Sequence, residues 1–225
     1  NLRGAQVENT NFSRASLAGA DLSGIRISGA KLAGANLTGA RIEFPELLRA
    51  DLREVDVAGT DLSGVDLRGR DLRGVDFSRC RMTGANLSGA DLSGADLSGA
   101  DLEGADLSRA KFHRSFLSDA NLSGARLVEA EVRNSFLDGA RLDGCDLSGA
   151  RMIENDMGGL DLTKAILRRV TFAHSSLAGA KLAGSDLSTC DLSDDNLSDA
   201  ELEAAVLTGA TANGVRFAGA TLRQA

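Results

Sequence analysis

The 225-residue sequence has no tryptophan and no tyrosine, and it contains only one proline, two histidines and three cysteines. Nucleic acids are commonly bound through aromatic stacking and basic surfaces, whereas this chain has few aromatic residues and a net charge of −7. His113 and His174 lie far apart, and neither has a cysteine or glutamate at metal-ligand spacing. We therefore expect no nucleic-acid partner and no metal site.

The sequence also has no apolar run long enough to cross a membrane and no basic-then-apolar start of the secretory kind. These absences favour a cytoplasmic protein without a membrane span. The nearest two of Cys80, Cys145 and Cys190 are 45 residues apart, and all three stand where alanine is common. We expect buried free thiols rather than disulfides.

A strict five-residue repeat organises the whole chain. With the positions of each pentad numbered from Asn1, position two is Leu, Ile, Val, Phe or Met in 44 of 45 pentads, and Ala212 is the exception. Position five is small in 39 pentads, and 25 of the 26 glycines stand at position four. An unbroken repeat of this kind predicts one solenoid domain over residues 1–225.

The period of five excludes continuous helices and strands. A step of five residues rotates an apolar position by about 500° around a helix, so that no apolar stripe forms. In a strand, the same odd step would place successive leucines on opposite faces. The chain must therefore bend once per pentad, and glycine at position four suits the positive φ of a tight turn.

The A-(D/N)-L-x-x pattern, as in residues 90–94 (ADLSG) and 120–124 (ANLSG), resembles that of the pentapeptide-repeat proteins. The resemblance covers the whole chain. It implies an all-β fold, a right-handed quadrilateral β-helix with four pentads per coil and with positions two and five pointing inward. For this chain length the expectation is about 11 coils and, at the usual strand spacing, a rod roughly 54 Å long.

Some pentads depart from the pattern. The segment 41–50 loses the Asp and the Gly, and Pro45 replaces one small residue and removes a backbone donor, so we expect a local irregularity there. Arg70 and Asp195 stand at position five, where the side chain should point inward. Burying either charge without a partner would cost several kcal/mol. We therefore expect the wall to flare outward at both residues.

Two phenylalanines offer a candidate interaction site. Phe116 and Phe136 stand at position one, which faces solvent, and their 20-residue separation places them on adjacent coils. Lys111, Arg114 and Arg133 are close to them in sequence. An exposed aromatic pair with nearby cations suggests a protein-docking spot, although stacking alone would also shield the two rings.

Most of the acidity lies at position one. Two sets of aspartates are expected to stack on neighbouring walls, with Asp51, Asp71 and Asp91 on one and Asp56, Asp76 and Asp96 on the next. Short acidic side chains bond to nearby backbone groups in turns, so a structural role is the first interpretation. An acidic wall that attracts a basic partner is the second.

Catalysis has no candidate residues. Serine is abundant, but no histidine stands in a pattern that would activate it, and every glycine recurs as a turn residue rather than in a phosphate-binding loop. No carboxylates suggest a buried acid–base pair. The sequence therefore predicts a protein that is not an enzyme and needs no cofactor.

Two functions remain open. The first is a structural and interaction scaffold, a stiff rod whose walls or open ends dock other proteins, including further copies end to end. Bacterial pentapeptide-repeat proteins include such rods fused to other domains or associated with secretion, and we expect this chain to be a segment of a longer protein. The alternative is a DNA-mimicking, gyrase-binding protein, because the quinolone-resistance branch of the family presents acidic walls. This sequence lacks that branch's loop insertions and C-terminal helix.

Overall fold

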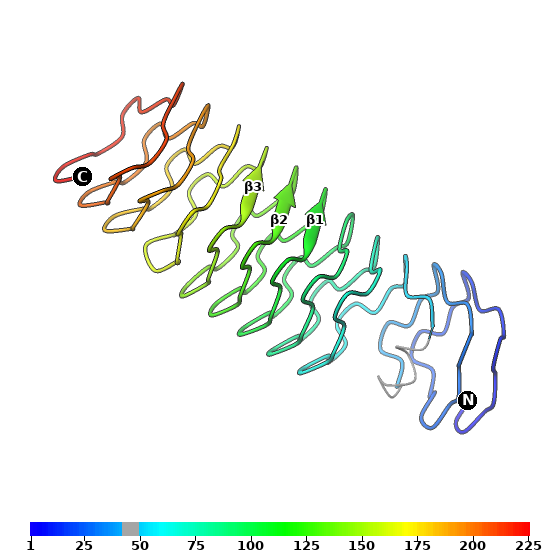
Figure 1. The fold of residues 1–225 in the computed structure, drawn as a ribbon. Coiled ribbons are helices and arrows are strands. Elements are labelled where there is room, and N and C mark those ends of the chain that lie inside the picture. The colour runs from blue at the N-terminus through cyan, green and yellow to red at the C-terminus, as the bar shows by residue number, and fades with distance from the viewer. Residues whose placement is uncertain (42–49) are drawn as a thin grey trace.

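A computed structural model describes residues 1–41 and 50–225, which form a stack of similar coils with the two termini at opposite ends (Figure 1). No described residue is helical. The expected irregularity over 41–50 falls almost wholly on residues outside the described ranges. Each pentad within the described ranges contains a turn or bend, as the period of five predicts.

Adjacent coils pair in parallel with a constant register. Every isolated bridge joins residues 20 apart, as in Asp71 with Asp91 and Lys181 with Glu201. One coil therefore contains four pentads, and each pentad forms one wall of a four-sided β-helix. Residues at the same position of pentads 20 residues apart lie directly next to one another along a wall.

Three short strands extend this pairing. They are β1 (Lys111–His113), β2 (Glu131–Arg133) and β3 (Arg151–Ile153), and they form a parallel sheet in the order β1-β2-β3 (Figure 1). Phe112, Val132 and Met152 are aligned in its register. The three strands lie on successive coils of a single wall.

The core is a thin column of side chains from positions two and five. Leucines at position two and alanines at position five are buried along the middle of the array, as the repeat pattern predicts. Phe77, Phe112 and Phe172 are the largest fully buried side chains. The core is continuous from coil to coil, so each coil is stabilised mainly by its two neighbours.

The corner at position four has a left-handed backbone whatever residue occupies it. Among the described residues, 25 glycines and 17 other residues have positive φ, and all stand at position four. The non-glycine values run from 50° at Asn134 to 65° at Thr189. The repeat geometry therefore imposes this conformation, and glycine lowers its cost rather than creating it.

The expectation that the wall flares at Asp195 is wrong. Asp195 is fully buried, and its Oδ1 atom accepts a hydrogen bond from the backbone N–H of Ser175 at 2.7 Å. At Arg70 the side chain is partly buried, and its Nη2 donates to the carbonyl of Ala50 at 2.9 Å. Both side chains meet backbone groups of the preceding coil, which reduces the cost that motivated the expectation.

Candidate protein-interaction surface

The register defines one wall that we call the fourth wall. It consists of the pentads that begin at residues 16, 36, 56, 76, 96, 116, 136, 156, 176, 196 and 216. Phe116 and Phe136 lie on it, and their rings are stacked with centroids 5.3 Å apart and planes 8° from parallel. The residues are 43% and 49% exposed. Stacking therefore covers only the facing sides of the two rings.

Acidic residues continue the ladder on both sides of this pair. Bridges join Asp56 to Asp76, Asp76 to Asp96 and Asp96 to Phe116, and a further bridge joins Phe136 to Asp156. The aromatic pair is thus an apolar interruption in a line of carboxylates. This arrangement depends on the 20-residue register, because these residues are dispersed over 101 positions of the sequence.

The fourth wall carries most of the net charge. Its pentads contain seven aspartates and two arginines, a net charge of −5, against −7 for the whole chain. The rest of the chain therefore sums to only −2. A surface with one dominant sign of charge attracts partners of the opposite sign.

The aspartates of the fourth wall also lack the cations that neutralise acids on other walls. On the wall before it, Arg53 pairs with Asp51, and Arg73 pairs with Asp71 at 2.7 Å and approaches Asp91 at 3.9 Å. Within the described ranges, no aspartate of the fourth wall forms an ion pair. The two expected sets of aspartates therefore lie on neighbouring walls in different electrostatic surroundings.

Hydrogen bonding lowers the pKa of the paired acids. The side chain of Arg53 donates to Asp51, and that of Arg73 donates to Asp71, and these bonds hold both carboxyl pKa values below their usual range. The bonds in turn raise the pKa of each guanidinium. These acids are consequently ionised and already have a partner.

All six predicted aspartates also have a structural role. In each case Oδ1 accepts a hydrogen bond from the backbone N–H two residues later, as Asp96 does from Ser98 at 2.8 Å and Asp91 from Ser93 at 3.1 Å; the acceptors are Asp51, Asp56, Asp71, Asp76, Asp91 and Asp96. One oxygen of each carboxylate therefore stabilises the turn, as the first interpretation of the sequence predicted. The second oxygen is free to meet a partner on the fourth wall, except at Asp56, where it accepts from Thr38.

Two of the predicted basic residues lie on a different wall from the aromatic pair. Lys111 and Arg133 belong to β1 and β2 on the preceding wall, and Arg114 stands at the corner between the walls with φ of 55°. Arg133 lies 3.9 Å from the carboxylate of Glu131. The corner therefore separates Lys111 and Arg133 from the wall of the phenylalanines, whereas Arg114 stands where the two walls meet.

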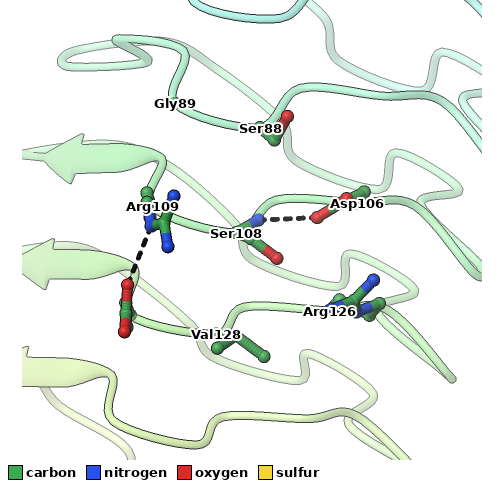
Figure 2. Close-up of a pocket in the computed structure, with 8 residues that line it drawn as sticks. Ser88, Gly89, Asp106, Ser108, Arg109, Arg126 and Val128 are labelled. Carbon is green, nitrogen blue, oxygen red and sulfur yellow. Dashed lines mark hydrogen bonds and ion pairs between the residues drawn. The ribbon is translucent and has the colours of Figure 1, made fainter.

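A groove on another wall offers no catalytic arrangement. It encloses about 400 Å³ and is lined by Ser88, Gly89, Asp106, Ser108, Arg109, Arg126, Val128 and Glu129 (Figure 2). Arg109 Nε donates to Glu129 at 2.8 Å, and the Ser108 N–H donates to Asp106 at 3.0 Å. The lining contains no histidine to activate a serine. Its charges neutralise one another instead of converging on a ligand.

The described residues form neither a metal-binding cluster nor a helix of the membrane-spanning kind. No group of three or more His, Cys, Asp or Glu side chains among them is arranged to hold a metal ion. The same part of the chain contains no helix with the length and hydropathy of a membrane span.

The four-sided coil with a 20-residue register defines the class of protein: a quadrilateral β-helix built from five-residue repeats. The family model described as "Pentapeptide repeats (8 copies)" matches residues 1–39, 26–69, 60–99, 71–109, 85–124, 105–144, 137–169, 156–194 and 196–225. The chain belongs to this family. The resemblance noted from the sequence is therefore confirmed.

Solved structures similar to this chain include HetL from the cyanobacterium Nostoc sp. strain PCC 7120, a pentapeptide repeat protein involved in heterocyst differentiation regulation. It is 28% identical with a TM-score of 0.46, covering all of this chain and 87% of HetL. QnrB1, a plasmid-mediated fluoroquinolone resistance protein, is 18% identical with a TM-score of 0.41, covering 94% of this chain and 91% of QnrB1. A thylakoid-lumen pentapeptide repeat protein from Arabidopsis thaliana is 35% identical over 41% of this chain and 68% of its own, with a TM-score of 0.35. No curated protein sequence matches the chain significantly.

Proposed function

We propose that this chain is a non-catalytic protein-interaction scaffold whose fourth wall docks a basic segment of another protein. The observation that carries the proposal is the stacked, half-exposed pair Phe116 and Phe136 within a line of unpaired aspartates. Aromatic anchors supply much of the binding energy at protein interfaces. Charged groups around them contribute mostly to association rate and partner choice.

The chemistry of the wall specifies the partner segment. An apolar or planar side chain suits the two phenylalanine rings, and lysine or arginine residues on either side suit the aspartates that flank them. A rigid wall loses little conformational entropy on binding, because its side chains are already held by the coil. The scaffold therefore needs no rearrangement to present this surface.

The experiment compares two matched double variants of the purified chain in capturing proteins from its host. Phe116→Asp with Phe136→Asp removes the aromatic pair and introduces the commonest position-one residue. Ile166→Asp with Val206→Asp makes the same change at two other exposed position-one residues, which are 42% and 45% exposed on a different wall. We expect the first variant to lose captured partners and the second to retain them. Equal capture by both would contradict the proposal.

A second pair of substitutions tests the charges. Asp76→Asn with Asp96→Asn removes two charges but retains an oxygen for the turn, since Asn86 Oδ1 accepts the Ser88 N–H at 3.1 Å in the same way. We expect about a tenfold weaker affinity at low ionic strength and a smaller difference at high salt, because salt screens exposed charges. An affinity independent of these charges at low salt would contradict the basic-partner part of the proposal.

The alternative, a DNA-mimicking protein that binds gyrase, is favoured by the acidic fourth wall alone. The wall's carboxylate line is interrupted by the two phenylalanines, and the remainder of the chain is close to neutral. The scaffold explains this uneven charge distribution better, because a mimic of duplex DNA needs regularly spaced negative charge.

A further inference from the structure

A line of polar side chains lies inside the rod. It begins at the residues that follow β1, β2 and β3 and continues over the next two coils of the same wall. Its members occupy position five of pentads 20 residues apart, where the pattern favours small apolar residues; they are Ser115, Ser135, Asn155, Ser175 and Asp195. None is more than 3% exposed. Buried polar atoms need hydrogen-bond partners, so each member must find them within the coil stack.

Asn155 shows how one member is satisfied. Its Oδ1 accepts from the backbone N–H of Ser135 at 3.0 Å, and its Nδ2 donates to the carbonyl of Val132 at 2.9 Å. In an ordinary coil these two backbone groups bond directly, as the N–H of Ala120 does to the carbonyl of Leu117 at 3.0 Å. Asn155 therefore inserts between the two groups of the preceding coil, which requires one acceptor and one donor.

Ser135 and Ser175 make the same insertion with a single hydroxyl. Ser175 Oγ accepts from the N–H of Asn155 at 3.2 Å and donates to the carbonyl of Met152 at 2.8 Å. Ser135 Oγ accepts from the N–H of Ser115 at 3.1 Å and donates to the carbonyl of Phe112 at 2.9 Å. Each donation reaches the carbonyl 23 residues earlier in the chain.

Asp195 occupies the equivalent position on a later coil, but only one of its two carboxyl oxygens has a hydrogen-bond partner within the described ranges. Its Oδ1 accepts from the N–H of Ser175, but its Oδ2 is buried and has no hydrogen-bond partner among the described residues. The 23-residue offset leads from Asp195 to the carbonyl of Phe172. That carbonyl receives no backbone N–H in the described part of the chain, because Ser175 donates to Asp195 instead. An ionised carboxylate has no donor to complete the arrangement.

We propose that Asp195 is a neutral carboxylic acid in the folded protein and that the proton on its Oδ2 is donated to the carbonyl oxygen of Phe172. In this form Asp195 matches Asn155 atom for atom, with Oδ2–H in the place of Nδ2–H. It thereby supplies the one acceptor and one donor that this position requires.

The charges around Asp195 favour its neutral form. Burial, with an added contribution from Asp191 and Asp194 in the same pentad, raises the pKa of Asp195 to about 8, although the hydrogen bond from Ser175 acts in the opposite direction. The pentad 211–215 on the next coil contains no charged residue. On the preceding coil His174 is the ionisable residue of pentad 171–175, and the buried Cys190 thiol at the adjoining corner donates to the carbonyl of Leu167 at 2.9 Å.

This protonation makes the stability of the coil depend on pH. The folded-state pKa of about 8 lies above the ordinary value of 3.8, so the folded protein binds one more proton than the unfolded chain between these values. The contribution of Asp195 to stability is complete below pH 3.8 and is lost as the pH rises toward 8. Across this window the folding equilibrium constant falls by about tenfold per pH unit on account of this residue.

The decisive measurement is a carbon-13 NMR titration of aspartate carboxyl groups in the intact chain, in which the Asp195 signal is the one lost in Asp195→Asn. We expect that signal to titrate near pH 8, whereas a midpoint below about pH 5 would overturn the proposal. Stability measurements on the same pair provide a second test. Asp195→Asn should match the original chain at pH 4 and exceed it progressively up to pH 8, and a difference independent of pH would overturn the proposal.

Asn155→Asp is the matched reverse substitution. It places an acid where the amide now donates to Val132, so it should introduce a second signal with a raised carboxyl pKa and steepen the loss of stability with rising pH. If Asp195→Asn fails to fold, Asp195→Ser assigns the signal instead, because a serine hydroxyl supplies one acceptor and one donor at the equivalent Ser175; the midpoint in the original chain still decides the proposal.

Discussion

Phe116 lies flat against Phe136 on the next coil, with ring centroids 5.3 Å apart, and neither ring enters the core. The pair therefore contributes to the free energy of unfolding only through the stacking of the two rings, which is worth about 0.5–1.5 kcal/mol. Replacing both residues with Asp should lower the free energy of unfolding by about 1 kcal/mol, since like charges on adjacent coils add only a few tenths. Urea denaturation measures this value. A loss above about 3 kcal/mol would show that the pair stabilises the fold substantially.

Position four gives a second prediction. Gly94 has φ of 69°, and a Cβ added there would meet nothing closer than the Gly74 backbone nitrogen at 4.0 Å. Space is available, so Gly94→Ala should cost only the conformational strain of about 1–2 kcal/mol. Ala204, with φ of 57°, is the matched reverse, and Ala204→Gly should raise stability by up to about 1 kcal/mol. In denaturation experiments, we expect the free energy of unfolding to fall in Gly94→Ala and to rise in Ala204→Gly. A change in the same direction in both variants would contradict the prediction.

The three cysteines give a third prediction. Cys80, Cys145 and Cys190 are free thiols and at most 1% exposed, and burial raises the pKa of Cys145 to about 12 and that of Cys190 to about 11. The thiolate is the reactive form. Maleimide should therefore label the native protein slowly and the denatured protein fast, with Cys145 the slowest. Rapid native labelling of all three would contradict their inward placement.

The fourth prediction separates the two functional hypotheses. As a scaffold, the purified chain should leave DNA supercoiling by gyrase unchanged at micromolar concentration. A DNA mimic would instead inhibit supercoiling, and its inhibition would weaken with added salt because exposed charges are screened. Potent, salt-sensitive inhibition would replace the scaffold proposal with the mimic.

Residue pattern alone predicted the bend in each pentad, because an apolar residue at every fifth position points one way only if the chain turns that often; the resemblance to the pentapeptide-repeat proteins added the inward direction of positions two and five. It also predicted the stacking of Phe116 on Phe136 once a coil of four pentads was assumed. The left-handed corners at residues such as Arg79 and Thr189 were not evident, because the pattern there depends on glycine and these residues disfavour that conformation.

The sequence by itself determined the period, the inward positions and the turn-stabilising aspartates, since these follow from interactions within one pentad. The tertiary structure decided the charge, ion pairing and burial that depend on which pentads are neighbours. It gathered a net charge of −5 on the fourth wall, moved Lys111 and Arg133 to another wall, and enclosed Asp195 in the core. The physical reason is that charge, ion pairing and burial act between residues 20 or more apart, which become neighbours only when the coils stack.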